Sequence, residues 1–255
     1  MIDDKEMCYI HQTEIEMLKE MDQICKNNNL RYSLAFGSIL GAVRHEGFIP
    51  WDSDVDIWVD FDEYNVFVKC MKKGLSSKFK VFDSDSDNQY EYLFARIGLT
   101  GEPHHTIHID IFPVGGAPKN RFLATKMWPF LRYLSSQMYA MKKVDSDVVY
   151  KNEREKRILS KIFKVILFFI PSSILKIVYK YLFSKYPIGL SKYLTNGHFT
   201  MKKEWYFETI KLPFETLKLN VPKDYDGFLR VVYGNDYMIP KKTNYYNKNM
   251  RYEVQ

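Results

Sequence analysis

Apolar side chains recur at every third or fourth position near the N-terminus, with glutamate and lysine residues between them. Over residues 12–26 this spacing places Ile15 and Leu18 on one face, which is the pattern of an amphipathic helix. The three asparagines that follow are typical of a helix end. Shorter helices are predicted over residues 39–44 and 63–73.

Short runs rich in β-branched and aromatic residues lie between and after these helices. Such runs, bounded by glycine, proline, asparagine or aspartate, are typical of β-strands. The first part of the chain is therefore α+β, with a small mixed sheet flanked by helices. The predicted strands are residues 30–36, 54–59, 80–82, 90–98 and 106–112.

The pattern changes after Pro118. Residues 120–185 are helical in pattern, and residues 201 to 255, rich in tyrosine, lysine and asparagine, are predicted to be irregular. We therefore expect an α+β core over residues 1–118, a helical region over residues 119–200 and a C-terminal segment over residues 201–255 that packs back on the core.

The most apolar stretch of the chain is residues 158–183. A membrane span needs about 20 largely uncharged residues, and Lys161, Lys164, Pro171 and Lys176 interrupt this stretch. We therefore predict no membrane-spanning helix here. Two interpretations stay open: a pair of ordinary core helices, or a helix pair that lies on a membrane surface.

Composition narrows the class of protein. The 255 residues are 46% hydrophobic and carry a formal net charge of +6, which excludes a disordered chain and mildly favours anionic partners. Three scattered cysteines and an acidic N-terminus without an apolar stretch favour a reducing compartment and no secretory signal. We expect a cytoplasmic protein, with peripheral contact at the inner face of the cell membrane left open.

Two acids alternate with two aliphatic residues in one predicted strand. Because side chains alternate along a strand, Asp54 and Asp56 point to one face while Val55 and Ile57 enter the core. Carboxylates placed side by side repel each other unless a cation lies between them, and oxygen ligands suit Mg²⁺ or Mn²⁺. Asp52 lies two residues before Asp54 and would point to the same face, but it is at the edge of the predicted strand. There it either supports the metal ligands or forms a turn.

A third acid, Asp110, lies in a later apolar strand. An aspartate there is costly without a partner. If this strand lies beside the first one, Asp110 completes a cluster of three carboxylates that can hold divalent ions against the phosphates of a nucleotide. His108 shares the face of Asp110 and is a candidate for lining the site.

Gly37 and Ser38 lie between a predicted strand and a predicted helix. A glycine allows close approach of the backbone, and the first N–H groups of a helix can bind a phosphate. Arg44 and His45 follow at the end of the same helix and are candidates for phosphate contact, although cations are common at helix C-termini. Arg96, in another strand, is a weaker candidate for binding an anion.

At these residues the chain resembles the LicD family, the bacterial phosphocholine transferases related to fukutin and the fukutin-related protein. The family block runs approximately G-[TS]-x-L-G-x-x-R-x-x-G-x-I-P-W-D-x-D-x-D, followed by an [LI]-D-[IV]-F motif and a C-terminal tyrosine-rich signature. The matching residues are Gly37, Ser38, Leu40, Gly41, Arg44, Gly47, Ile49, Pro50, Trp51, Asp52, Asp54 and Asp56; then Ile109, Asp110, Ile111 and Phe112; then Pro222, Tyr225, Leu229, Tyr233, Gly234, Tyr237 and Pro240.

The resemblance implies a nucleotidyltransferase fold like the polymerase-beta core, with Asp54, Asp56 and Asp110 as metal ligands. It implies transfer of a phospho-substituent from a CDP-activated donor to a hydroxyl of a cell-surface glycan, with release of CMP. Phosphocholine is the first expectation for the group, and ribitol or glycerol phosphate the alternatives. Choline recognition requires aromatic side chains, for which Trp51, Trp58 and the C-terminal tyrosines are candidates. A lipid-linked acceptor would explain the basic, apolar helices.

Two other functions stay open. The same core can transfer a nucleotidyl group to a sugar or another small acceptor. That reaction would release diphosphate or a phospho-sugar leaving group, whereas transfer of a phospho-substituent releases CMP. The chain can also be a non-catalytic module that binds phosphate or nucleic acid, but three convergent carboxylates argue against this because they repel phosphate. We therefore expect no nucleic-acid partner.

Overall fold

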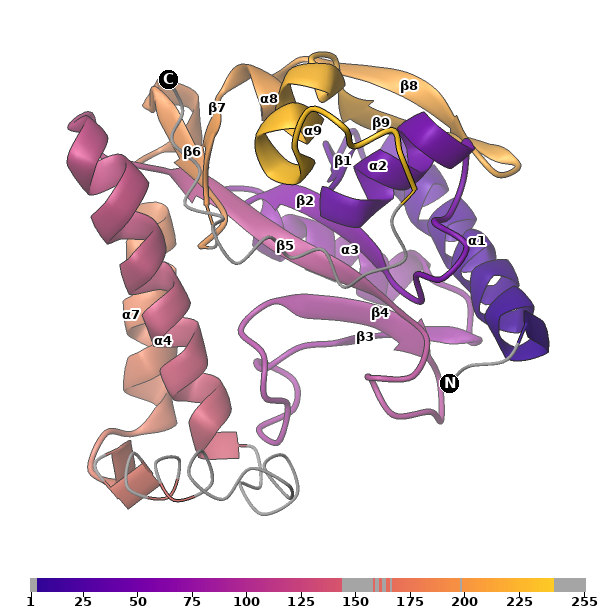
Figure 1. Ribbon diagram of the computed structural model, residues 1–255. Helices are drawn as coiled ribbons and strands as arrows, with labels where there is room; N and C mark the ends of the chain where they lie inside the picture. Colours follow the sequence, from indigo (N-terminus) through magenta and orange to yellow (C-terminus); the bar gives the residue numbers. More distant parts are fainter. Residues whose placement is uncertain are drawn as a thin grey trace.

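Helices and strands alternate through the computed structural model (Figure 1), which confirms the mixed α and β class. The domain boundaries expected above stay a prediction. No helix among the described residues is long and apolar enough to cross a membrane. The structure describes residues 4–143, 167–197 and 199–240, together with residues 158, 161, 164 and 165.

The central sheet contains β1 (Ser33–Leu34), β2 (Val55–Asp60), β3 (Phe79–Phe82), β4 (Ala95–Leu99) and β5 (His108–Gly116). They lie in the order β1-β2-β5-β4-β3. β2 and β5 run parallel, whereas every other neighbouring pair in this order is antiparallel. The two strands that carry the predicted acids are therefore adjacent at the centre of the sheet.

The far end of β5 leaves this arrangement and pairs with a further short strand. β6 (Tyr193–Thr195) is antiparallel to β5, and β7 (Thr200–Lys202) is antiparallel to β6. A side chain at Gly116 of β5 could not fit, because its Cβ would lie 2.3 Å from the carbonyl oxygen of Tyr186. This close approach fixes the sheet against the segment that precedes β6.

Three helices pack around β2 and β5: α1 (Asp4–Asn27), α2 (Phe36–His45) and α3 (Tyr64–Gly74). α1 contacts α3 and β5, and α2 contacts β2; Figure 1 shows α1 as a long indigo helix at the edge of the core. The apolar face predicted for the first helix is buried in the main core. α2 begins at Phe36 and not at residue 39, so Gly37 and Ser38 lie inside its first turn.

Residues 204–233 are not irregular as predicted, and residues 241–255 of that predicted segment lie outside the described residues. Residues 204–233 contain α8 (Glu204–Phe207), β8 (Thr209–Phe214), β9 (Leu217–Pro222) and α9 (Tyr225–Tyr233). β8 and β9 form a hairpin. Their buried side chains join the core cluster that also contains those of β2, so packing against the core stabilises a segment whose composition suggests a loop.

The helical region is present where it is described. It contains the π-helical turn η1 (Leu123–Met127), α4 (Trp128–Lys143) and α7 (Ser172–Ser184). α4 packs against α7, and Figure 1 shows the two helices side by side at one end of the sheet. We call η1, α4 and α7 the helical layer. The part of the predicted helical stretch at residues 144–157 lies outside the described residues.

One buried cation ties the helical layer to the sheet. Arg132 of α4 is 0% exposed. Its guanidinium donates to the carbonyl oxygens of Leu182, Gly116 and Thr195, at 2.8, 2.7 and 2.6 Å. Five donors on a planar group can satisfy several carbonyls at once. Burial lowers the pKa of Arg132 to about 9, so the guanidinium stays charged at neutral pH.

The predicted strand over residues 90–98 is wrong in its first half, because β4 begins at Ala95. Tyr90 and Tyr92 instead make edge-to-face contacts with His104, with ring centroids 4.9 and 5.9 Å apart. Aromatic residues favour strands in general, but here they gain more contact by packing around a loop histidine.

Candidate active site

The sheet register places two of the three predicted acids side by side. β2 and β5 pair in parallel with Asp56 opposite Asp110. Asp54 comes directly before β2, on the same face as Asp56 because of the alternation along the strand. The expected juxtaposition of the two acid-bearing strands is therefore confirmed. We call Asp52, Asp54, Asp56 and Asp110 the acid cluster.

The acids repel one another and are poorly hydrated. Asp110 is buried, while Asp52, Asp54 and Asp56 are half-buried, so the cluster opens to solvent on one side. Removal from water, together with Asp54 and Asp110, raises the pKa of Asp56 well above its usual value. Burial and the adjoining Asp54, to which Asp52 is hydrogen-bonded, raise the pKa of Asp52 to about 7.

A single arginine partly neutralises the cluster. Arg96 of β4 lies opposite Asp110, and its Nε and Nη2 donate to the two oxygens of that carboxylate, the second at 3.1 Å. The Arg96 guanidinium also lies 4.3 Å from the ring centre of Tyr92, a cation–π contact. Burial raises the pKa of Asp110, and Arg96 opposes that rise. Arg96 therefore orients Asp110, whereas the sequence suggested an anion-binding role for it.

His108 lies beside the acid cluster, as its strand parity predicts. Its Nε2 is 3.6 Å from Oδ1 of Asp110, and its Nδ1 has no hydrogen-bond partner in the structure. Burial and the positive charge of Arg96 lower the pKa of His108 to about 4. The imidazole is therefore neutral at physiological pH.

The acid cluster suits a hard cation in its chemistry more than in its present geometry. Its donors are all carboxylate oxygens, which Mg²⁺ and Mn²⁺ prefer, and in the part of the chain that the structure describes Arg96 is the one arginine or lysine that forms an ion pair with the cluster. Among the described residues, however, no group of three or more His, Cys, Asp or Glu side chains is arranged to hold one ion. The chemistry of the donor set still fits such a metal.

The first turn of α2 lies against the acid cluster. A Cβ on Gly37 would lie 2.9 Å from Oδ2 of Asp52, so a larger residue at this position would displace that carboxylate. The hydroxyl of Ser38 accepts a 2.9 Å hydrogen bond from the backbone N–H of Asp56. Ser38 thus fixes α2 to β2, and its predicted contact with a phosphate stays a prediction.

Arg44 and His45 lie at the opposite end of α2 from Gly37. Arg44 Nη1 donates to the carbonyl oxygen of Tyr237 at 2.8 Å, and its Nε donates to His45 Nε2 at 2.9 Å. Burial, and then the charge of Arg44, lower the pKa of His45. The contacts of Arg44 hold the C-terminal part of the chain, and a phosphate contact for either residue stays a prediction.

The two tryptophans considered for choline binding lie in different environments, one buried and one exposed. Trp58 is fully buried among core rings, and its ring centre is 5.2 Å from that of Phe228. A Trp58 placed in this way cannot form part of an open cage. Trp51 remains exposed on the loop before the acids, next to His45.

One acid near the cluster, Glu14 of α1, was not predicted from the sequence. It is 0% exposed, and neither of its oxygens has a hydrogen-bond partner in the structure. A signal was available, because Glu14 interrupts the apolar stripe formed by Ile10, Met17 and Leu18. A charged residue in the buried stripe of a helix is rare without a partner.

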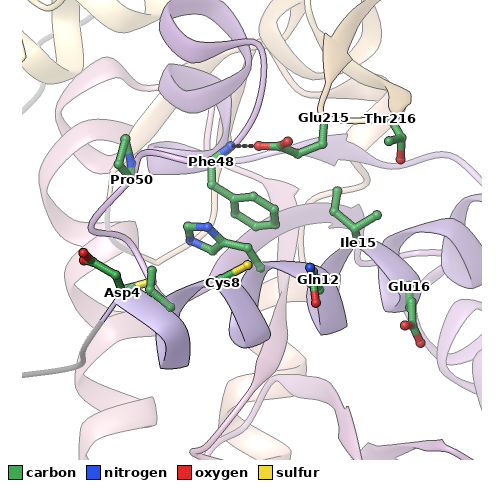
Figure 2. Close-up of a pocket in the computed structure, with 11 residues that line it drawn as sticks. Asp4, Cys8, Gln12, Ile15, Glu16, Phe48, Pro50, Glu215 and Thr216 are labelled. Carbon is green, nitrogen blue, oxygen red and sulfur yellow. Dashed lines mark hydrogen bonds between the residues drawn. The ribbon is translucent and has the colours of Figure 1, made fainter.

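A cavity of about 680 Å³ adjoins the loop that leads to the acids. Figure 2 shows it between α1, Phe48 and Pro50, with the Glu215 carboxylate accepting a 3.2 Å hydrogen bond from the backbone N–H of Phe48. His11, in its wall, stacks on Phe48 at 4.1 Å and contacts the carbonyl oxygen of Asp52 at 2.7 Å. The cavity wall and the acid-bearing loop are thus physically linked.

Comparisons with known proteins agree with the resemblance noted above. The model of the family described as LicD/FKTN/FKRP, nucleotidyltransferase domain, matches residues 29–145. This segment contains the whole acid cluster, and the resemblance to the LicD family is confirmed over it.

Similar proteins include the Haemophilus influenzae lipopolysaccharide cholinephosphotransferase LicD, 43% identical over 54 residues, which are 21% of this chain and 20% of that protein. The mouse ribitol 5-phosphate transferase FKRP is 29% identical over 102 residues, 39% of this chain and 19% of that protein. The matched segments thus span about a fifth of these relatives. The crystal structure of ANT(2")-Ia in complex with adenylyl-2"-tobramycin aligns over 68% of this chain and 98% of that one, at 11% identity and a TM-score of 0.29, too low to support an argument.

Proposed function

We propose that this chain is a metal-dependent transferase of the LicD type, with a polymerase-beta-like catalytic core. It moves a phospho-substituent from a CDP-activated donor to a glycan hydroxyl and releases CMP. The observation that carries the proposal is the register pairing of Asp56 with Asp110, beside Asp54, inside the segment that matches the family model. Phosphocholine is our first candidate for the group, and ribitol or glycerol phosphate the alternatives.

Asp54, Asp56 and Asp110 are the residues that would hold Mg²⁺ or Mn²⁺. The bound ion would offset the charge of the donor phosphates and of the leaving group. Gly37, at the first turn of α2, lets the helix N–H groups approach a donor phosphate without a side chain in the way. Arg96 keeps the Asp110 carboxylate in one orientation.

The reaction is a displacement at phosphorus. The acceptor hydroxyl oxygen forms a bond to the phosphorus of the transferred group as the bond from that phosphorus to the CMP oxygen breaks. The hydroxyl proton passes to a carboxylate of the acid cluster, and Asp110 is the candidate with a fixed orientation. CMP leaves with the electron pair of the broken bond.

The acceptor in this proposal is carried on a lipid, and the helical layer contacts the membrane. On α7, the exposed residues Ile174, Ile177, Val178 and Tyr181 recur with the spacing of one helix face. The exposed residues Leu123, Met127, Phe130 and Leu134 form a similar stripe on η1 and α4. With the net charge of +6, these stripes favour an anionic bilayer surface.

The test is CMP release from CDP-choline, CDP-ribitol and CDP-glycerol, each incubated separately with the protein and Mg²⁺. Release from one donor, absent in Asp56→Asn, supports the proposal and identifies the group. Release of diphosphate from a nucleoside triphosphate and a sugar, with no CMP from any donor, would instead indicate nucleotidyl transfer. If no donor yields CMP and none raises the thermal midpoint of the protein, the proposal is wrong.

A further inference from the structure

The surroundings of Glu14 do not explain why a carboxylate is buried there. The side chain is fully buried on α1, yet both carboxylate oxygens are without hydrogen-bond partners. Burying an unpaired carboxylate costs several kcal/mol, whereas an apolar residue of similar size would cost nothing. Glu14 also lies outside residues 29–145, so the family match assigns it no role.

The neighbours of Glu14 are other acids. After burial itself, Asp54 and Asp52 are the groups that raise the pKa of the Glu14 carboxyl. Arg96, the cation of the site, is paired with Asp110. The contact between His11 and the carbonyl oxygen of Asp52 holds α1 against the acid-bearing loop, one helical turn from Glu14. The helix thus places a third carboxylate within electrostatic reach of Asp52 and Asp54, and no positive charge in the described part of the chain offsets it.

We propose that Glu14 is a cation-site residue, whose carboxylate joins Asp52 and Asp54 in holding a divalent cation of the oxygen-preferring class at the acid-bearing loop. This inference deepens the proposed function, because it rests on a metal-dependent site and adds to it a residue from a helix outside the matched segment. A buried carboxylate that two other carboxylates destabilise is stabilised when a cation binds, and α1 would thereby become part of the metal site.

A cation bound between the three carboxylates would offset their mutual repulsion. Metal binding should therefore draw α1 and the loop together and raise the thermal midpoint of the protein, because a ligand that binds only the folded state stabilises it.

The experiment compares the full chain with Glu14→Gln, Glu16→Gln and Asp56→Asn. Mn²⁺ affinity is measured by calorimetry, and the thermal midpoint is measured with and without Mn²⁺. Glu16 is the matched control, since it lies on the same helix, is exposed and pairs with Lys78. For Glu14→Gln we expect a metal-free midpoint above that of the wild type, an Mn²⁺ affinity lower by about 10-fold or more and a smaller rise of the midpoint with Mn²⁺. Glu16→Gln should match the wild type in the last two.

An Mn²⁺ affinity of Glu14→Gln equal to that of the wild type would overturn the inference. If Asp56→Asn loses Mn²⁺ binding in the same experiment, the proposed function stands while the inference falls. If the wild type binds no Mn²⁺, the metal dependence itself fails. Should Glu14→Gln not fold, Glu14→Asp is measured in its place: it keeps the charge but withdraws the oxygens by one methylene, so weaker Mn²⁺ binding supports the inference and unchanged binding overturns it.

Discussion

The sheet and the helical layer depart from the usual distribution of residues in opposite directions. At the sheet and on α1, which packs against it, the ionisable side chains of Glu14, Arg96 and Asp110 are buried. In the helical layer, Phe130 is 56% exposed and Ile177 is 65% exposed. Buried charge and exposed apolar surface are the two observations that carry information about function, because stability alone favours neither.

The difference fits the proposal that the two regions recognise different things. Strand register positions the acids, and their mutual repulsion can be relieved by a cation and its bound phosphates. The apolar stripes of the helical layer can be covered by a lipid surface. Arg132 connects the two, since it links α4 to the carbonyl of Gly116 at the end of the strand that bears Asp110. The following predictions test each side of the comparison.

The largest effect is expected at the acid cluster itself. Asp56→Asn should lower CMP release by about 10³-fold or more, because the carboxylate proposed to hold the metal against the phosphates is lost. Thermal unfolding without metal should show a midpoint no lower than that of the wild type, since one of several mutually repelling charges is removed. A variant with full activity, or one that loses activity only because it unfolds, would contradict this role.

The next effect concerns the junction of the two regions. Arg132→Met should destabilise the protein by about 3 kcal/mol or more, because several buried carbonyls lose their donor together. Urea unfolding measures this cost. Arg230→Met is the control: Arg230 is exposed and pairs with Asp226 within α9, and because such a surface ion pair contributes little, its urea midpoint should match that of the wild type. Equal costs for the two variants would show that Arg132 does not hold the layer.

The helical layer is tested with lipid. Ile177→Glu should weaken binding to vesicles of phosphatidylcholine and phosphatidylglycerol by about tenfold or more, because burial of one such side chain contributes about 1.5–3 kcal/mol. Vesicle sedimentation measures the binding. Val66→Glu adds the same charge at an exposed apolar residue of α3 and should bind as the wild type does. If the wild type ignores vesicles but forms dimers that Ile177→Glu disrupts, the stripe is an interface between copies of the chain.

The sequence predicts a structural feature well when the pattern that determines it lies within a short stretch of the chain. Alternation along two strands was enough to predict that Asp54, Asp56 and Asp110 share one face, and a parallel pair of strands then brings them together. Glu14 was missed because it lies far from the motif in sequence. Only the packing of α1 against β5 brings it near the acids.

The missed hairpin has a different cause. Two-residue turns of hairpins usually contain glycine or asparagine, which adopt a positive φ easily. Between β8 and β9 the turn residue with positive φ is Glu215, at 53°. Its conformation is maintained from outside the hairpin, because its N–H donates to the carbonyl oxygen of Glu46 at 2.6 Å and its carboxylate accepts from Phe48. No local pattern in the sequence could show these contacts.

The smallest effect is expected at Asp60 of β2. It tests whether burial or the acid cluster on the same strand raises the pKa of this carboxyl. Asp60 lies at the far end of β2 from Asp56, and burial raises its pKa to about 6. A carboxyl whose pKa is higher in the folded than in the unfolded state stabilises the protein fully below the unfolded value, and this contribution is lost as pH rises through about 6. Asp60→Asn should therefore lose less stability than the wild type between about pH 4 and pH 7. The difference in urea midpoint between the two proteins, followed across that range without metal, measures the effect.

If Mn²⁺ changes this difference, Asp60 belongs to the cation site after all. If it does not, the pKa of Asp60 is raised without the metal site, and the response to metal is confined to the end of β2 that carries the acid cluster.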